Sequence, residues 1–168
     1  RCDEGEIHLL LNKKTMAGLA GYVRKDRLSP RGIDRACEVL SEYRQIIDHF
    51  PIDRVFVFAT ASLRNVANTD EAVAAIEAAT GFEVEILTGS REAFLDFIGA
   101  AHFTRLSSGV LVDIGGGSTE IVTFTAGEAD RALSIPIGSL KLYTAYVESV
   151  LPDKAERKKI RQRVMAEL

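Results

Sequence analysis

The sequence predicts an α/β protein in which a mixed sheet is covered by helices. Two observations lead to this prediction. Apolar, β-branched runs alternate with segments whose apolar residues recur at helical spacing, which is the βαβ rhythm of a sheet with flanking helices. Glycines and prolines separate these segments, as expected for turns and helix ends. The chain has 168 residues, 46% of them hydrophobic, which is enough for one domain or two small ones.

The first elements are a strand and a long helix. Residues 6–14 follow a turn and are expected to form a strand. Ser29 and Pro30 are a typical helix start, because serine caps the first turn and proline fits its first position. Apolar residues at helical spacing then predict a helix over 30–49.

The middle of the chain repeats the alternation. Residues 54–60 form a continuous apolar run, which is typical of a strand buried on both faces. We expect Gly81 to end the helix that follows. The next three elements should be a helix, a short strand and a second helix, at residues 69–81, 82–87 and 90–103.

The remainder of the chain adds strands and then helices. Residues 109–115 again have the pattern of a buried strand. Residues 119–138 predict two strands joined by a turn at 126–128. A helix is expected over 139–150, and Pro152 should start a last helix whose lysines and arginines form a solvated face.

Composition excludes several classes of function. The net charge is −3 without a basic block, so we expect no nucleic-acid partner. No apolar run approaches the ~20 residues that span a bilayer, and no signal peptide is visible, so we expect a cytoplasmic protein without a membrane partner. The two cysteines, Cys2 and Cys37, have no paired spacing and predict neither a zinc site nor a disulfide framework.

The stretch "LVDIGGGSTEIV" (111–122) is the strongest motif. It combines an acid at the end of a strand, Asp113, with three glycines, two hydroxyl residues and Glu120. Glycines allow positive φ and a close ligand, and successive amides can form an anion-binding nest. A carboxylate beside such a nest is reasonable if it holds Mg²⁺, and Glu120 could serve the same ion or position a water. The alternative is a glycine-rich bend in an ordinary sheet.

Two further strand ends carry polar candidates. Arg64 and Asn68 follow the strand at 54–60, and the guanidinium of Arg64 could grip phosphate oxygens. A surface salt bridge is the alternative for Arg64. Glu92 follows the next strand and lies near a helix start, where the helix dipole alone would favour a carboxylate.

Three segments in this order, "ATASLRNVAN", "ILTGSREA" and "LVDIGGGSTEI", resemble the exopolyphosphatase and guanosine pentaphosphate phosphohydrolase family. The segment "IPIGSLKLY" looks like the next conserved stretch of that family. The glycine stretch alone marks the wider actin, hsp70 and sugar-kinase superfamily. The resemblance implies two actin-like, ribonuclease-H-like lobes with an active site between them.

The resemblance also implies where the lobes lie. Residues 1–103 correspond to a first lobe, and residues 107–168 to the beginning of a second. The family starts with a strand and a "DxGSNS" phosphate loop, and nothing similar is present in this sequence. We therefore expect a first lobe without its opening strand. Open apolar sheet edges would favour association, so a homodimer is a candidate assembly.

Site residues follow from the resemblance position by position. Glu92 corresponds to the base that acts on the attacking water. Asp113 and Glu120 correspond to the pair associated with Mg²⁺, and Glu120 also with catalysis. The expected phosphate-binding residues are Arg64, Asn68, Gly115, Gly116, Gly117, Ser118 and Gly138.

The implied activity is Mg²⁺-dependent hydrolysis of a terminal phosphoanhydride, which releases orthophosphate from the end of inorganic polyphosphate. One alternative is hydrolysis of pppGpp, and no feature of the sequence separates the two substrates. Another alternative, from a different class, is a module that binds polyphosphate or nucleotide without turnover. A kinase is disfavoured by Glu92, because a hydrolase needs a base for water.

Overall fold

The computed structural model describes residues 2–3, 6–7, 9–105 and 107–168. The first segment consists of short elements: β1 (Cys2–Asp3), β2 (Glu6–Ile7), η1 (Leu19–Tyr22), β3 (Val23–Arg24) and β4 (Arg27–Leu28). The next segment contains α1 (Pro30–Ile47), β5 (Val57–Ala59), α2 (Ala61–Arg64), α3 (Thr69–Thr80), β6 (Val84–Ile86) and α4 (Gly89–Phe103). The last segment contains β7 (Gly109–Ile114), β8 (Thr119–Thr125), β9 (Glu128–Ile135), α5 (Ser139–Tyr146) and α6 (Lys154–Met165).

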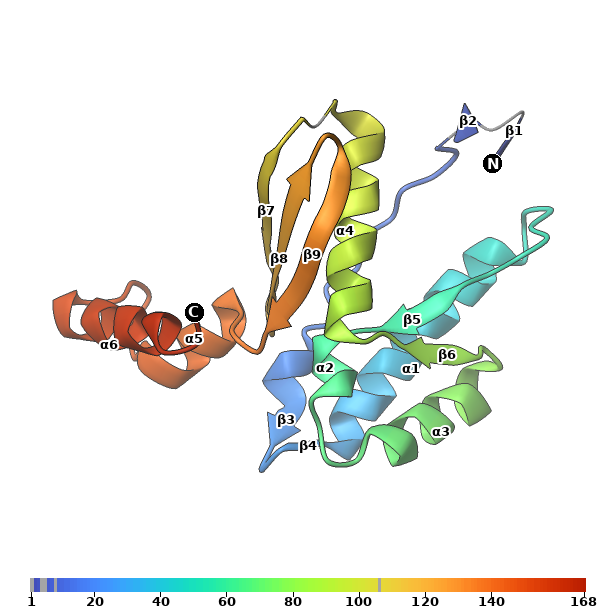
Figure 1. The fold of residues 1–168 in the computed structure, drawn as a ribbon. Coiled ribbons are helices and arrows are strands. Elements are labelled where there is room, and N and C mark those ends of the chain that lie inside the picture. The colour runs from blue at the N-terminus through green and yellow to red at the C-terminus, as the bar shows by residue number, and fades with distance from the viewer. Residues whose placement is uncertain (1, 4–5, 8, 106) are drawn as a thin grey trace.

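The predicted βαβ unit is confirmed. Strands β5 and β6 pair in parallel, with Val57 opposite Val84, and α2 and α3 form the connection between them. Helices α1 and α3 pack together beneath this pair (Figure 1). One buried cluster holds this part together; its members are Leu28, Ala36, Leu63, Val66, Ala72 and Ile76.

Two helix boundaries predicted from the sequence are confirmed, whereas the helix predicted over 139–150 is shorter and ends at Tyr146. Helix α1 begins at Pro30 with Ser29 as its N-cap residue. Helix α3 ends at Gly81, whose φ of 68° is the left-handed conformation that glycine adopts at low cost. Helix α6 begins two residues after Pro152, where Asp153 and Glu156 form a capping box.

The second part is an antiparallel sheet in the order β7–β8–β9 with α4 packed on one face (Figure 1). The predicted turn lies at Ala126 and Gly127, both with positive φ. Ala93 and Phe97 of α4 are buried against Val122 and Phe124 of β8. The last helix of the predicted first lobe therefore shares a core with the predicted second lobe, and the boundary between residues 103 and 107 remains a prediction.

The strand predicted over 6–14 is wrong in its length. Strand β2 comprises only Glu6–Ile7, paired with β1, and residue 8 lies outside the described residues. Residues 9–14 form no strand, and Leu9 and Leu10 are 77% and 70% exposed. A strand needs a neighbouring strand for its backbone hydrogen bonds, and among the described residues none lies beside this segment.

The predicted burial of two strands is wrong as well. Phe56 and Phe58 of the β5 run are 78% and 55% exposed, and Val110 and Val112 of β7 are 60% and 53% exposed. Successive strand side chains point to opposite faces. One face of each strand meets helices, whereas no described element covers the other face, so alternate residues stay exposed.

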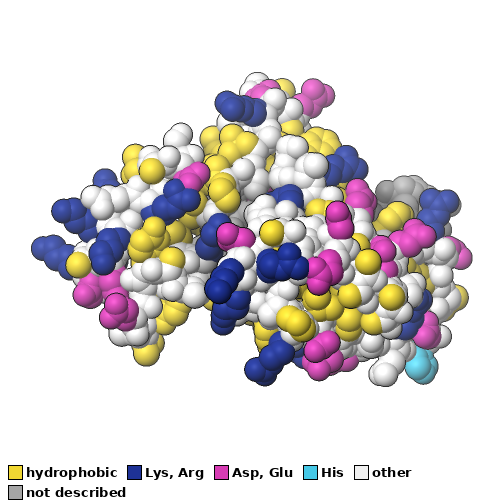
Figure 2. All heavy atoms as spheres, turned by 90° about the horizontal axis from the view of Figure 1, so that it is seen from below, with side chains coloured by type: hydrophobic (Ala, Val, Ile, Leu, Met, Phe, Trp, Pro, Cys, Tyr) yellow, Lys and Arg dark blue, Asp and Glu magenta, His cyan; other side chains and the backbone are white. Residues whose placement is uncertain are grey.

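The basic residues of α6 form a solvated face, as predicted. Figure 2 shows lysine and arginine side chains gathered at the end of the molecule that α6 forms in Figure 1. The exposed members are Lys154, Arg157, Lys158, Lys159 and Arg161. None of the described helices combines the length and the hydropathy that crossing a membrane requires.

The packing of α4 can be tested with two substitutions on this helix. Phe97 is 3% exposed and its ring centroid lies 5.4 Å from that of Phe124, whereas Phe103 is 84% exposed. We expect Phe97→Ala to lower the free energy of unfolding by about 3–5 kcal/mol, because it leaves a cavity in the shared core. Phe103→Ala, the matched control, should change it by no more than about 0.5 kcal/mol. Urea unfolding measures both, and equal effects would contradict the packing.

Candidate active site

Helix α4 carries two acidic side chains toward the sheet. It begins after β6 with Thr88 as N-cap, whose hydroxyl accepts a hydrogen bond from the Arg91 amide at 3.2 Å. Glu92 in the first turn and Asp96 one turn later are four residues apart, so they lie on the same face of the helix. Ala93 and Phe97, which flank that face, are the residues buried against β8, and this packing fixes the position of both acids.

The structure brings Arg64 and Glu92 together. Arg64 Nη1 donates to Glu92 Oε2 at 2.7 Å and to the carbonyl of Leu87 at 2.9 Å. Both side chains are largely buried, at 17% and 16% exposure, so this is not a surface salt bridge. Among the described residues, neither Arg64 Nη2 nor Glu92 Oε1 has a hydrogen-bond partner, which leaves donors and an acceptor for a ligand.

Three carboxylates form a second group beside this pair. Asp113 at the end of β7 is the register partner of Glu120 on β8, and Asp96 faces them from α4. Oxygen atoms of Asp96, Asp113 and Glu120 all lie within 4.8 Å of one another. Glu120 is 2% exposed and its Oε1 accepts from Ser134 Oγ at 2.7 Å. Such a set of carboxylates has the chemistry of a site for a hard divalent cation.

Asp96 completes the group in a way that fits a cation. Its Oδ2 is buried and has no hydrogen-bond partner among the described residues. Burial is the largest cause that raises the pKa of Asp96, and together with the charges of Asp113, Glu120 and Glu92 it raises this pKa to about 6. An unpaired buried carboxylate oxygen is costly, and a cation or a proton at this position would remove the cost.

The arginine pair and the acidic group are connected through the start of α4. At Gly89 a side chain would lie 2.5 Å from Ser134 Cβ and 3.7 Å from Arg64 Nη2. The absence of a Cβ therefore lets α4 approach β9 closely. Ser134, which binds Glu120, and Arg64, which binds Glu92, therefore both lie next to Gly89.

The glycine stretch forms a tight turn between β7 and β8. The Gly115 amide donates to the Ser118 carbonyl at 3.0 Å. The amides of Gly116 and Gly117 donate no hydrogen bond within the described part of the chain, as an anion-binding turn requires. The expected positive φ is wrong, because none of the three glycines has one. Close packing explains the glycines better: a Cβ at Gly117 would lie 3.3 Å from Ala61 Cβ.

Gly138 packs directly against the backbone of this turn. A Cβ at Gly138 would overlap the backbone of Gly116 and Gly117. The first residues of α5 bond to the same turn, since the amides of Ser139 and Lys141 donate to the carbonyls of Gly115 and Gly116 at 2.8 and 3.0 Å. The structure thus gives Gly138 a packing role beside the turn.

One predicted phosphate contact, Asn68, is engaged by the backbone instead. Asn68 is 6% exposed, and its amide both accepts from and donates to the backbone of Leu28, at 2.8 and 3.0 Å. This pairing fixes the start of α3 to β4 and indicates a structural role. Ser118, another predicted phosphate contact, is 3% exposed as a residue, and its contact with phosphate stays a prediction.

Comparison with known proteins shows the family of this chain. The profile of the Ppx/GppA phosphatase family matches residues 1–168. The chain belongs to the Ppx/GppA phosphatase family. The exopolyphosphatase from Cytophaga hutchinsonii is similar to this chain, with a TM-score of 0.91 and 25% identity over 100% of the chain. The Ppx/GppA family member from Aquifex aeolicus shares 27% identity over 99% of the chain, with a TM-score of 0.75.

These comparisons confirm the predicted α/β fold class, which is that of the Ppx/GppA family. The chain spans 55% of the length of each of these two relatives. The activity of a whole family member is therefore a proposal for this chain.

Sequence reasoning missed Asp96 and Ser134. Asp96 could have been found, because its spacing from Glu92 places both acids on one helical face. Ser134 gave no such signal, since its contact with Glu120 depends on the register of β8 and β9.

The packing role of Gly138 can be tested by adding one methyl group. We expect Gly138→Ala to lower the free energy of unfolding by about 1–3 kcal/mol and to impair activity, because Cβ would displace the turn at Gly116 and Gly117. Gly99→Ala is the matched control, since a Cβ there meets nothing within 4 Å. Denaturant unfolding combined with an activity assay distinguishes the two, and an unaffected Gly138→Ala protein would contradict the contact.

The raised pKa of Asp96 predicts a pH-dependent stability. Because the folded-state pKa of about 6 exceeds the ordinary value of 3.8, the folded state holds this proton more tightly. Its contribution to stability is complete below about pH 4 and is lost as pH rises through about 6. In EDTA at pH 7, we expect Asp96→Asn to be more stable than wild type by about 1 kcal/mol.

This difference should become small toward about pH 4, because Asp96 is protonated there in the folded state and gains its proton in the unfolded state only near its ordinary pKa of 3.8. Asp53→Asn is the control, because Asp53 is an exposed carboxylate in a loop. Urea unfolding across this pH range measures both variants. A loss of stability in Asp96→Asn at neutral pH would show that the carboxylate is satisfied in the folded protein.

Proposed function

We propose that this chain contributes the active site of a phosphohydrolase that releases orthophosphate from the end of inorganic polyphosphate. The observation that best supports this proposal is the pair formed by Arg64 and Glu92 beside the glycine turn. Arg64 ends α2, and Ala61, at the start of the same short helix, contacts Gly117 of the turn. A hydrogen-bond donor for phosphate, a base and a turn with free amides therefore lie in one local arrangement.

The chain's own residues supply the steps of hydrolysis. The free amides of Gly116 and Gly117 and the Nη2 and Nε donors of Arg64 would hold the terminal phosphoryl group. Glu92 Oε2 is anchored by Arg64, and its Oε1 is free to accept a proton from water. The water oxygen attacks phosphorus as Glu92 takes the proton, and the bond to the bridging oxygen breaks. The electron pair of that bond leaves with the shortened chain.

Asp96, Asp113 and Glu120 fit a divalent cation such as Mg²⁺, because they offer clustered oxygen ligands, one of them buried without a partner. A cation there would offset charge on the transferring phosphoryl group and on the leaving chain. Asp113 and Glu120 were predicted as ligands, and the geometry adds Asp96 to the proposal. Glu120 would thus act through the ion, with Ser134 fixing its orientation.

The choice of polyphosphate over pppGpp follows the similarity to an exopolyphosphatase. The comparison that decides the substrate is orthophosphate release from polyphosphate and from pppGpp by the same preparation.

Within this proposal, residues 1–103 and 107–168 belong to two lobes whose facing surfaces supply Arg64 and Glu92 on one side and the acidic pair of β7 and β8 on the other.

The role of Glu92 can be tested with an isosteric substitution. We expect Glu92→Gln to reduce kcat about 10²–10⁴-fold, which is the typical contribution of one general base. Binding of polyphosphate should remain largely intact, because glutamine keeps the size of the side chain. Glu85→Gln, on the exposed side of β6, is the matched control and should behave as wild type.

The measurements are orthophosphate release and calorimetric binding, made with the protein that carries this sequence. Equal loss of turnover and binding in Glu92→Gln would argue against a role as base. Binding of polyphosphate by the wild-type protein without any turnover would instead favour a binding module.

A further inference from the structure

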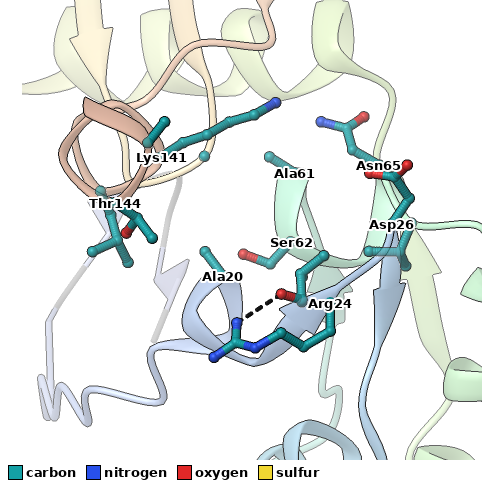
Figure 3. Close-up of a pocket in the computed structure, with 13 residues that line it drawn as sticks. Ala20, Arg24, Asp26, Ala61, Ser62, Asn65, Lys141 and Thr144 are labelled. Atoms are coloured by element: carbon teal, nitrogen blue, oxygen red, sulfur yellow. Dashed lines mark hydrogen bonds between the residues drawn. The ribbon is translucent and has the colours of Figure 1, made fainter. Parts of the chain in front are cut away.

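A cavity of about 260 Å³ lies next to the proposed site, and its side chains take no part in the steps above. Its walls come from two sides of the molecule (Figure 3). Arg24 and Asp26 of the β3–β4 hairpin and Ser62 of α2 line one side, whereas Gly117 and Lys141 line the other. Because Gly117 belongs to the glycine turn, the cavity borders the turn proposed to hold the terminal phosphate.

Two cationic side chains face this cavity from opposite walls. Arg24 Nη1 donates to the carbonyls of Gly21 and Val23 at 2.9 and 2.8 Å. Lys141 Nζ donates to the carbonyl of Pro136 at 3.0 Å, and its side chain extends from α5 across the cavity toward α2 (Figure 3). These partners are neutral, and within the described part of the chain neither cation forms a salt bridge.

Apolar side chains such as Val23, Val66 and Leu140 form part of the wall, and the polar part of the lining favours phosphate groups over a nucleoside. The cavity is below the roughly 300–1,000 Å³ of pockets that enclose drug-sized ligands. No aromatic ring lines it, so a base would find no stacking surface. Ser62 and Asn65 add neutral donors to the two cations. Asp26 is the one acid in the lining, and it makes no ion pair with Arg24 or Lys141 within 4.0 Å among the described residues.

We infer that this cavity binds inner phosphate groups of a linear polyphosphate, with Arg24 and Lys141 as the residues that recognise them. The inference rests on the proposed function, because it assumes that the terminal phosphate occupies the glycine turn. The Lys141 amide bonds to Gly116, so the residue that binds inner phosphates is attached to the turn that binds the end of the chain. Chain binding and terminal-phosphate binding then use separate side chains.

The test compares the binding of two anions that differ in length. Orthophosphate can occupy only the terminal site, whereas a long polyphosphate reaches both. In the Glu92→Gln background, which prevents turnover, we expect Lys141→Met and Arg24→Met each to raise the Kd of polyphosphate about tenfold, the loss expected for a charge-assisted hydrogen bond. The Kd of orthophosphate should not change. Lys159→Met, an exposed lysine of α6, is the matched control and should change neither.

Each outcome of this calorimetric comparison has a definite meaning. An unchanged Kd for polyphosphate, or an equal loss for both anions, would overturn the inference. With pppGpp as a third ligand, weaker binding of pppGpp alone in Lys141→Met, Arg24→Met and Asp26→Asn would overturn the inference in favour of a nucleotide pocket. Failure of the proposed function gives a different result: wild-type protein would release no orthophosphate, while the difference between the two anions would persist.

Discussion

The packing of α4 against the three-stranded sheet is the contact on which the site depends. Phe97 and Ala93 are buried against Val122 and Phe124, and this contact fixes both the rotation and the depth of the helix. Glu92 then meets Arg64, and Asp96 meets the carboxylates of β7 and β8. Without this apolar contact, the helix would carry the same two acids but would not hold them beside Arg64 and the carboxylates of the sheet.

Charge imbalance is the second constraint. Four carboxylates, those of Glu92, Asp96, Asp113 and Glu120, interact within one region, and Arg64 pairs with only the first of them. Burial and such crowding both disfavour the ionised state, and together they raise the pKa of Asp96. A divalent cation would relieve the repulsion among the other three, whereas the arginine keeps Glu92 oriented. In the proposed chemistry, Glu92 is therefore assigned to proton transfer, and the other three carboxylates are assigned to holding the cation that neutralises charge.

Backbone contacts set the shape of the phosphate cradle. Gly138 touches the backbone of the turn at Gly116 and Gly117, and α5 bonds to its carbonyls. These bonds use the carbonyl groups on one side and leave amides free on the other, which is the polarity that an anion needs. The same contacts attach Lys141 to the turn, so the cavity beside it shares its rigid support.

The sequence by itself determined the order and type of most elements, because turn residues and apolar spacing act locally. Pro30 begins α1 and Gly81 ends α3 as expected, and the hairpin of β8 and β9 turns at Gly127. The sequence also singled out Arg64, Glu92, Asp113 and Glu120 by their positions at strand ends. These local signals survive folding because they depend on the conformation of a few neighbouring residues.

Only the tertiary structure decided which of these residues meet and which faces are buried. Asn68 was a reasonable phosphate ligand by position, but its amide is used by Leu28, forty residues away in sequence. Phe58 and Val112 have the pattern of buried strand residues and yet are exposed. Burial and charge pairing depend on which surfaces come together, and spacing along a single strand or helix carries no information about the surface opposite.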